Sequence, residues 1–143
     1  MTTEAWRFQR PERLPLPDPS EEAIPFWDAL RGGELRLQRC AACAAIQHPP
    51  RAMCASCRSF EFEWAASSGR GTVYSYVVTH QPIHPALAGH TPFATVEVEL
   101  EEGVRLTSNL LDVPPDEIEI GMPVRLALTR IDDEVTMPYF ERT

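Results

Sequence analysis

Alternating apolar and polar residues dominate the second half of the chain. The alternation predicts five β-strands, because every second side chain of a half-buried strand points to the same face. The expected strands span residues 71–80, 93–100, 103–111, 123–130 and 134–140. Glu101-Glu102-Gly103 is expected to form a tight hairpin turn, and residues 114–118 one helical turn. Five strands with this insertion fit a small closed barrel, and the OB-fold is the leading candidate because an open sandwich needs more strands.

A helical spacing precedes these strands. An apolar stripe is formed by Ile24, Phe26, Trp27 and Leu30. Asp18 and Pro19 have the character of a helix cap and first helical residue, and Gly32-Gly33 is expected to end the helix. Pro25 is expected to kink it. Four prolines between residues 11 and 19 predict an extended arm over residues 1–19, which Trp6 and Phe8 could anchor on a partner or on the domain.

Two cysteine pairs lie between the helix and the predicted barrel. The four cysteines of the chain are Cys40, Cys43, Cys54 and Cys57. Strand-like alternation at Leu35 and Leu37 leads into the first pair, and at Phe60, Phe62 and Trp64 it leads out of the second. Two CxxC motifs at this separation are typical of knuckles that bind one tetrahedral zinc. Because sulfur would fill all four positions, we expect the zinc to be structural.

The alternatives are a pair of disulfides, four unconnected thiols, or a redox CxxC motif. Residues 1–30 contain no positively charged start followed by an apolar run, so a cytoplasmic protein with reduced thiols is expected. No apolar run approaches the length of a membrane span. A redox motif normally opens a helix, whereas these pairs have strand-like flanks. The sequence therefore favours three parts: an arm and helix over residues 1–33, a zinc ribbon over 34–66 and an OB-fold barrel over 67–143.

Charge is distributed unevenly along the 143 residues. The formal net charge is −8, which argues against general nucleic-acid binding. Residues 31–70, however, carry six arginines against three glutamates, a local charge of +3. Arg51 and Arg58 in this stretch are candidates to meet phosphates or an acidic partner surface, although arginines also commonly solvate a small ribbon. The chain contains no lysine, which excludes Schiff-base and P-loop chemistry based on that residue.

Other candidate sites are weaker. Three histidines, His80, His84 and His90, lie in a proline-containing loop, where a ligand contact or a solvated loop is more plausible than a second metal. Tyr74 and Tyr76 are expected on one strand face, more plausibly as core than as a binding platform. No GxSxG motif is present, so nucleophilic catalysis has no supporting pattern.

The segments PFWDALRGGELRLQRC and VEVELEEGVRLTSNLLDVPPDEIEIGMPV resemble a family that joins a rubredoxin-like zinc ribbon to an OB-fold. The resemblance covers roughly residues 18–140, and the zinc role transfers to the four cysteines alone. It implies a non-catalytic accessory subunit of a thiolase-superfamily enzyme, either an acyltransferase (thiolase) or a carbon–carbon lyase (aldolase) that cleaves side chains of steroid CoA thioesters. It further implies a heterotetramer with acyl-CoA at or near the shared interface.

Two other classes of function remain open from the residues. One is a nucleic-acid-binding or ribosome-associated zinc-ribbon/OB protein, against which the net charge of −8 counts. The other is an independent enzyme, which is disfavoured because the sequence offers no activated nucleophile and no open metal site.

Overall fold

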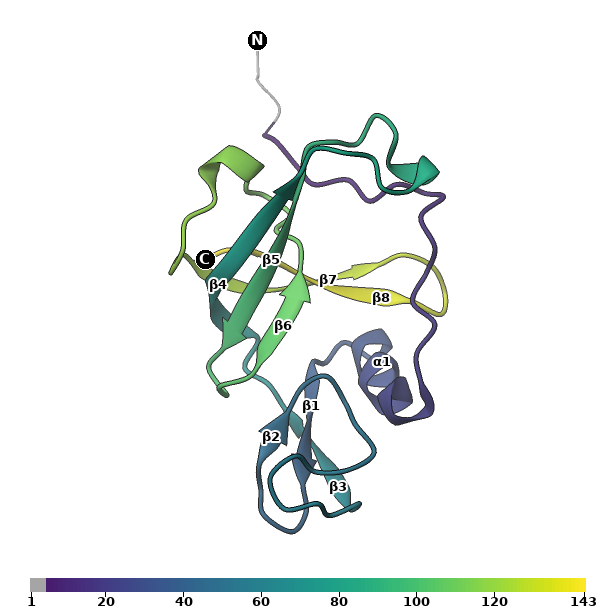
Figure 1. The fold of residues 1–143 in the computed structure, drawn as a ribbon, viewed down its shortest axis with the longest axis vertical. Helices are drawn as coiled ribbons and strands as arrows, with labels where there is room; N and C mark the ends of the chain where they lie inside the picture. Colours follow the sequence, from purple (N-terminus) through teal and green to yellow (C-terminus); the bar gives the residue numbers. More distant parts are fainter. Residues whose placement is uncertain (1–4) are drawn as a thin grey trace.

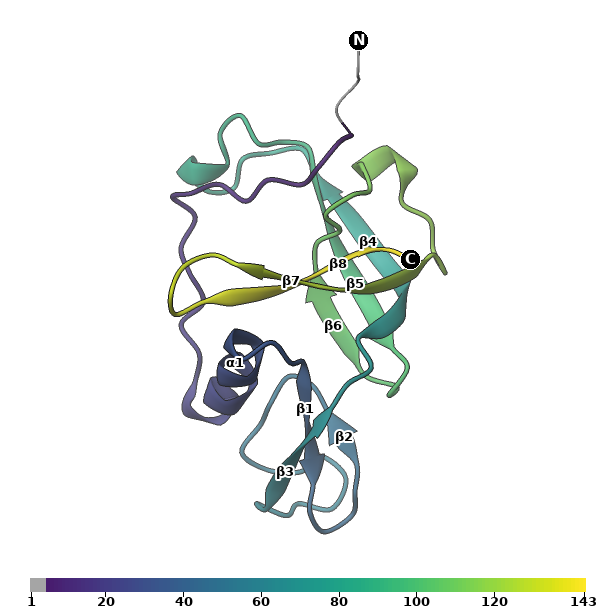
Figure 2. The ribbon, with the colours of Figure 1, turned by 180° about the vertical axis from the view of Figure 1, so that it is seen from behind.

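A computed structural model describes residues 5–143, so residues 1–4 of the predicted arm lie outside the described part of the chain. The fold consists of a three-stranded ribbon sheet, one α-helix and a curled five-stranded sheet. Figures 1 and 2 show the two sheets at opposite ends of the molecule, with α1 (Ile24–Arg31) between the ribbon sheet and the last two strands. The predicted fold class is confirmed.

Helix α1 follows a 3₁₀ turn at Glu21–Ala23, whose N-cap position is Ser20, although the Ser20 side chain makes no capping hydrogen bond. The predicted start at Asp18 is therefore two residues early. Pro25 lies in the first turn of α1, where its missing N–H group has no partner within the helix in any case, so the predicted kink is wrong.

The C-terminal end of α1 is where the sequence predicts it. The Gly32 N–H donates to the Asp28 carbonyl at 3.1 Å, and Gly33 has a φ of +94°, which is unfavourable for residues with a Cβ. Phe26 and Leu30 are buried on the face of α1 that contacts the two sheets.

The ribbon sheet has the order β2-β1-β3 and is antiparallel. Its strands are β1 (Arg36–Cys40), β2 (Ile46–Gln47) and β3 (Phe62–Ala66). Cys40 pairs with Phe62, so the first cysteine pair begins where β1 ends.

The larger sheet has the order β6-β5-β4-β7-β8 and is also antiparallel. Its strands are β4 (Arg70–Thr79), β5 (Phe93–Leu100), β6 (Arg105–Ser108), β7 (Pro123–Arg130) and β8 (Thr136–Arg142). A parallel bridge between Leu110 and Phe140 joins the two outer edges and curls the sheet into a barrel. Short 3₁₀ helices occupy Pro85–Leu87 and Pro115–Glu117, the latter within the predicted helical turn.

β6 is shorter than the predicted strand over 103–111. Gly103 lies in the turn with a φ of +92°, and the chain leaves the β5 ladder after Ser108 to reach β8. At that point the Leu111 N–H donates to the Phe140 carbonyl at 2.8 Å. The segment predicted as one strand therefore pairs first with β5 and then, after Ser108, with β8.

One hydrophobic core runs through the molecule. It joins Phe26 and Leu30 of α1, Leu35 and Leu37 at β1, and the inward side chains of the barrel, among them Val96, Val98, Leu106, Val124 and Phe140. β5 shows the alternation most clearly, since every second residue from Ala94 to Leu100 is buried. Among residues 5–143, no helix is long and apolar enough to cross a bilayer.

Candidate functional site

The two cysteine pairs form matching knuckles. In the first, the Ala44 N–H donates to the Cys40 carbonyl at 2.9 Å, and in the second the Arg58 N–H donates to the Cys54 carbonyl at 3.0 Å. Ala44 and Arg58 have φ angles of 65° and 68°, a left-handed conformation that is uncommon outside glycine. Each knuckle thus turns back sharply enough to aim both of its thiols at one point.

The four sulfur atoms all lie within 4.8 Å of one another. The Cys40 and Cys57 sulfurs are 3.5 Å apart, and the Cys43 and Cys54 sulfurs are 3.6 Å apart. A tetrahedral zinc with Zn–S distances of about 2.3 Å requires sulfur–sulfur separations of about 3.8 Å, whereas a disulfide requires about 2.05 Å. All four cysteines are free thiols, so the geometry fits a metal rather than two disulfides.

Backbone amides favour the thiolate form of the first cysteine in each knuckle. The Cys57 and Ser56 N–H groups donate to the Cys54 sulfur at 3.5 and 3.4 Å, and they lower the pKa of that thiol to about 6. The Cys43 N–H donates to the Cys40 sulfur at 3.5 Å and lowers its pKa as well. The neighbouring cysteines raise the pKa of Cys43 and Cys57 in turn, because thiolates gathered at one point repel one another. A cation among the four sulfurs would remove that repulsion, so the arrangement fits a structural zinc.

A buried glutamine fixes the loop between the knuckles. Gln38 on β1 is 3% exposed, and its side chain both accepts from the Arg51 N–H at 2.9 Å and donates to the Arg51 carbonyl at 2.8 Å. The Gln47 side chain extends the network, since its Nε2 donates to the Gln38 Oε1 at 2.8 Å and its Oε1 accepts from the Ala55 N–H at 3.1 Å. The sequence does not predict that Gln38 is buried, because it occupies a polar position next to Leu37 in the alternating strand pattern.

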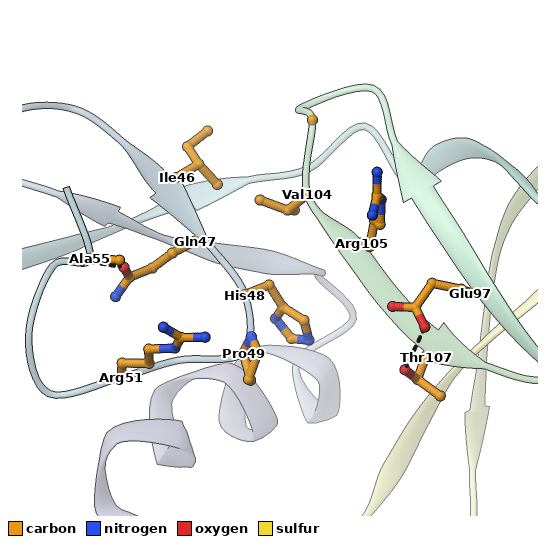
Figure 3. A pocket seen from close by; sticks show the side chains of 11 residues that line it. Ile46, Gln47, His48, Pro49, Arg51, Ala55, Glu97, Val104, Arg105 and Thr107 are labelled. Carbon is orange, nitrogen blue, oxygen red and sulfur yellow. Dashed lines mark hydrogen bonds between the residues drawn. The ribbon is translucent and has the colours of Figure 1, made fainter. Parts of the chain in front are cut away.

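A cleft of about 660 Å³ separates the ribbon from the barrel, and we call it the ribbon–barrel cleft. Figure 3 shows ribbon side chains on one side, barrel side chains on the other, and His48 and Pro49 between them. The ribbon contributes Ile46, Gln47, Arg51 and Ala55, and the barrel contributes Glu97, Gly103, Val104, Arg105 and Thr107. The sequence does not predict this cleft, because its two walls come from segments that are far apart along the chain.

The charges of the cleft are unequally partnered. Arg105 pairs with Glu99 at 3.2 Å and lies 3.5 Å above the Tyr74 ring. The Thr107 hydroxyl donates to Glu97 at 3.4 Å. Arg51, in contrast, forms no ion pair with any residue in the range 5–143.

His48 forms the inner wall of the cleft and is electrically neutral there. Burial lowers its pKa to about 4, and its Nδ1 atom is buried without a hydrogen-bond partner among the described residues. The ring packs against Phe26 with a centroid distance of 5.1 Å. His48 and Thr107 also border a second, smaller cavity of about 180 Å³, whose other walls are mainly apolar and include Trp27, Leu106 and Met137.

The remaining sequence candidates are scattered. Among the histidines of the 80–90 loop, the His84 Nδ1 atom accepts from the Ala86 N–H at 3.0 Å and so caps a 3₁₀ turn. Within the described residues, the four cysteines are the one cluster with metal-binding spacing. Arg58 lies at the knuckle turn and not in the cleft that Arg51 lines.

The sequence predicts Tyr74 and Tyr76 on one strand face, and this prediction is wrong. A β-bulge between Val73 and Ser75 shifts the register, so Tyr74 is 47% exposed while Tyr76 packs against the core. The expectation of core packing is therefore wrong for Tyr74.

Two family models match adjoining parts of the chain. The model described as "ChsH2, rubredoxin-like zinc ribbon domain" matches residues 27–63, and the model described as "ChsH2, C-terminal OB-fold domain" matches residues 64–129.

Two curated relatives are subunits of hydratases. The "Probable enoyl-CoA hydratase alpha subunit" of Thermomonospora curvata is 43% identical over 133 residues, which is 92% of this chain and 41% of the relative. The "3-oxo-4,17-pregnadiene-20-carboxyl-CoA hydratase alpha subunit" of Mycobacterium tuberculosis is 42% identical over 116 residues, 80% of this chain and 36% of the relative. The chain thus spans about two-fifths of the length of these relatives.

A solved structure described as "Ltp2-ChsH2(DUF35) aldolase" matches over nearly its whole length. The TM-score is 0.80 at 42% identity, and the match covers 89% of this chain and 98% of that one. The chain therefore belongs to the DUF35 family represented by ChsH2, in which a rubredoxin-like zinc ribbon precedes an OB-fold domain.

Proposed function

We propose that the chain is a non-catalytic accessory subunit of a thiolase-superfamily enzyme, an aldolase or a thiolase, that acts on acyl-CoA thioesters. The observation that carries this proposal is the 0.80 TM-score at 42% identity to a chain from an Ltp2-ChsH2(DUF35) aldolase. That description pairs a ChsH2 chain with a second component, Ltp2. We expect two copies of each subunit around a two-fold axis, because two-fold symmetry is the commonest closed symmetry of soluble oligomers.

The substrate class we favour is a steroid-type acyl-CoA whose side chain is being shortened. Support comes from the relative named for a pregnadiene carboxyl-CoA hydratase. Hydration of an α,β-unsaturated thioester yields a β-hydroxy thioester, and retro-aldol cleavage can break its Cα–Cβ bond. The chain is similar both to hydratase alpha subunits and to a component of an aldolase. This combination supports a role in the retro-aldol step that follows hydration.

We expect no carbon–carbon bond cleavage by the isolated chain. An iminium route needs a lysine-type amine, and the chain contains no lysine. A thiolysis route needs a free activated cysteine, and each of the four cysteines would be committed to zinc. We place the complex in the cytoplasm, where free thiols stay reduced.

Exposed apolar side chains on the ribbon are our candidates for the enzyme contact. Phe60 is 73% exposed and Met53 is 42% exposed, and both lie close to the knuckles. Aromatic and methionine side chains are enriched at the centres of protein interfaces. Arg58, which is exposed and forms no ion pair within residues 5–143, would favour an acidic rim on the partner.

Co-expression with a thiolase-superfamily protein from the same genome, followed by size-exclusion chromatography with light scattering, tests the proposal. We expect co-elution as a heterotetramer and cleavage of a β-hydroxyacyl-CoA only in the mixture. Phe60→Ser is expected to weaken co-elution, whereas Ile120→Ser, which changes a residue that is 63% exposed on the barrel, is the matched control. Separate elution of two soluble proteins, one of them fully active alone, contradicts the proposal.

A further inference from the structure

We propose that the ribbon–barrel cleft binds the phosphate groups of a small-molecule anion, with Arg51 and Arg105 as its two cationic contacts. The inference deepens the proposed function, on which it rests for the choice of a CoA-like ligand but not for the location of the site. It concerns a surface that lies between the two parts of the chain and is built from both.

The first argument is the partnering of the arginines between residues 31 and 70. Four of the six pair with a carboxylate, in the pairs Arg31–Asp28, Arg36–Glu34, Arg39–Glu63 and Arg70–Glu101. Within residues 5–143, Arg51 and Arg58 have no such pair, and of these two Arg51 alone lines the cleft. A guanidinium group without a carboxylate at the wall of a cleft is available to an external anion.

The second argument is that the backbone of Arg51 is held in place. Gln38 bonds both its N–H group, at 2.9 Å, and its carbonyl, at 2.8 Å. Because the Gln38 side chain is buried, these bonds anchor Arg51 to the ribbon sheet. Less conformational entropy is then lost when Arg51 binds a ligand, which is the usual benefit of preorganisation.

The third argument is the opposite wall of the cleft. Arg105 is oriented by Glu99 at 3.2 Å and by the Tyr74 ring at 3.5 Å. Figure 3 shows Arg51 and Arg105 on opposite sides of the pocket. The bond to Glu99 uses the Nε of Arg105, so Arg105 contributes its terminal N–H groups, while the unpaired charge of the lining comes from Arg51, since Glu97 is the one acidic lining residue.

The size and lining of the cleft favour a small molecule over a protein side chain. Its volume of about 660 Å³ falls within the range of small-molecule sites and far exceeds one carboxylate or phosphate. Gln47 and Thr107 add hydrogen-bonding groups beside the arginines. A nucleotide bisphosphate with a polar extension matches this combination, since arginine forks bind phosphate oxygens in pairs.

Isothermal titration of the zinc-loaded chain with 3′,5′-ADP, coenzyme A and phosphate-free pantetheine tests the proposal. We expect 3′,5′-ADP and coenzyme A to bind and pantetheine not to bind. Arg51→Gln should weaken coenzyme A binding about tenfold, the effect of one lost charged hydrogen bond. Arg58→Gln removes the same charge from an exposed ribbon residue outside the cleft and should leave the affinity unchanged. Glu97→Gln should strengthen binding by removing a negative charge from the lining.

Four results overturn the inference, and the fourth leaves the proposed function standing. One is an equal loss of coenzyme A affinity in Arg51→Gln and Arg58→Gln, which would indicate attraction by the overall positive charge of the ribbon and not a defined site. Another is equal binding of pantetheine and coenzyme A. The third is absence of phosphate-probe binding together with loss of partner co-elution in Arg51→Gln, which would assign Arg51 to a partner carboxylate. If no probe binds while co-elution persists in every variant, this inference fails and the proposed function stands.

Discussion

Individual residues of the ribbon have conformations that their chemical type does not suggest. Ala44 and Arg58 adopt φ angles of 65° and 68° at equivalent points of the two knuckles, where glycine would be less strained. The energy that offsets this strain is expected to come from metal binding, since four thiolates gathered without a cation repel one another. The zinc and the knuckle geometry are therefore interdependent.

Metal content is the most direct prediction at this scale. The purified chain should contain about one zinc per molecule, and Cys43→Ser should lose both the metal and the ribbon structure, because a three-sulfur site binds zinc far more weakly. Elemental analysis and a thiol titration measure this. Ser56→Ala, which alters the second knuckle but keeps four thiols, is the control and should retain zinc. Two disulfides with less than about half an equivalent of zinc would contradict the prediction.

His48 predicts a pH dependence of stability. Its pKa is lowered from 6.5 to about 4 by burial, so the unfolded chain binds a proton at a pH where the folded chain does not. The stability contributed by the neutral folded form is complete above about pH 6.5 and is lost as the pH falls toward 4. Between pH 7 and pH 5 the loss should be about 2 kcal/mol.

Urea unfolding of the wild type and His48→Gln at both pH values isolates this contribution. The zinc site is common to both proteins, so metal release at acidic pH cancels in the comparison. The wild type should lose more stability than the variant between the two values. Equal losses would show that His48 does not stay neutral in the folded chain.

At the scale of the elements, the period of the apolar pattern predicts most of the structure. The alternation in β5 places every second residue in the core, and the apolar stripe of α1 buries Phe26 and Leu30. The failures occur where a strand changes partner or register. The bulge before Ser75 turns Tyr74 outward, and the end of β6 at Ser108 depends on a bridge to Phe140, which lies far away in sequence. A local pattern holds no information on either event.

The close approach of β4, β5 and β7 gives a second element-scale prediction. Gly71 pairs with Leu100 on one side and with Val124 on the other, and an added Cβ would lie 2.4 Å from the Glu99 carbonyl oxygen. Because that oxygen belongs to the backbone of β5, the strands would have to separate. Gly71→Ala should destabilise the chain by about 3 kcal/mol, the upper end of typical overpacking costs.

Denaturant unfolding measures this cost, and Gly32→Ala is the matched control. An added Cβ at Gly32 would lie 3.4 Å from the nearest heavy atom, the Ala29 carbonyl oxygen, and its backbone does not require positive φ. Wild-type stability of Gly71→Ala would contradict the prediction, because it would show that the β4–β5 ladder accommodates the added Cβ without a measurable loss of pairing.

At the scale of the whole molecule, the ribbon and the barrel share one core. Leu35 and Leu37 at the ribbon strand β1 belong to the same buried cluster as Val98 and Phe140 of the barrel. A hydrogen bond also joins the end of the ribbon to the barrel: the Ser67 hydroxyl donates to Glu102 in the β5–β6 turn at 2.6 Å. The domain boundary near residue 66 stays a prediction from sequence. Because the ribbon and the barrel share a core, we expect them to unfold together.

Removal of zinc should therefore destabilise the entire chain and not the ribbon alone. Without metal the knuckles lose their crosslink, β1 loses its fixed end at Cys40, and Leu35 and Leu37 are withdrawn from the barrel core. Burial of each leucine contributes about 2 kcal/mol, so the barrel would lose a substantial share of a small domain's stability. Thermal unfolding of the zinc-loaded chain, followed in parallel by tryptophan fluorescence and far-ultraviolet circular dichroism, should give one coincident transition. Chelation should shift that single transition to lower temperature in both signals, whereas a barrel transition that stays at its original temperature after chelation would show that the shared core does not couple the two parts.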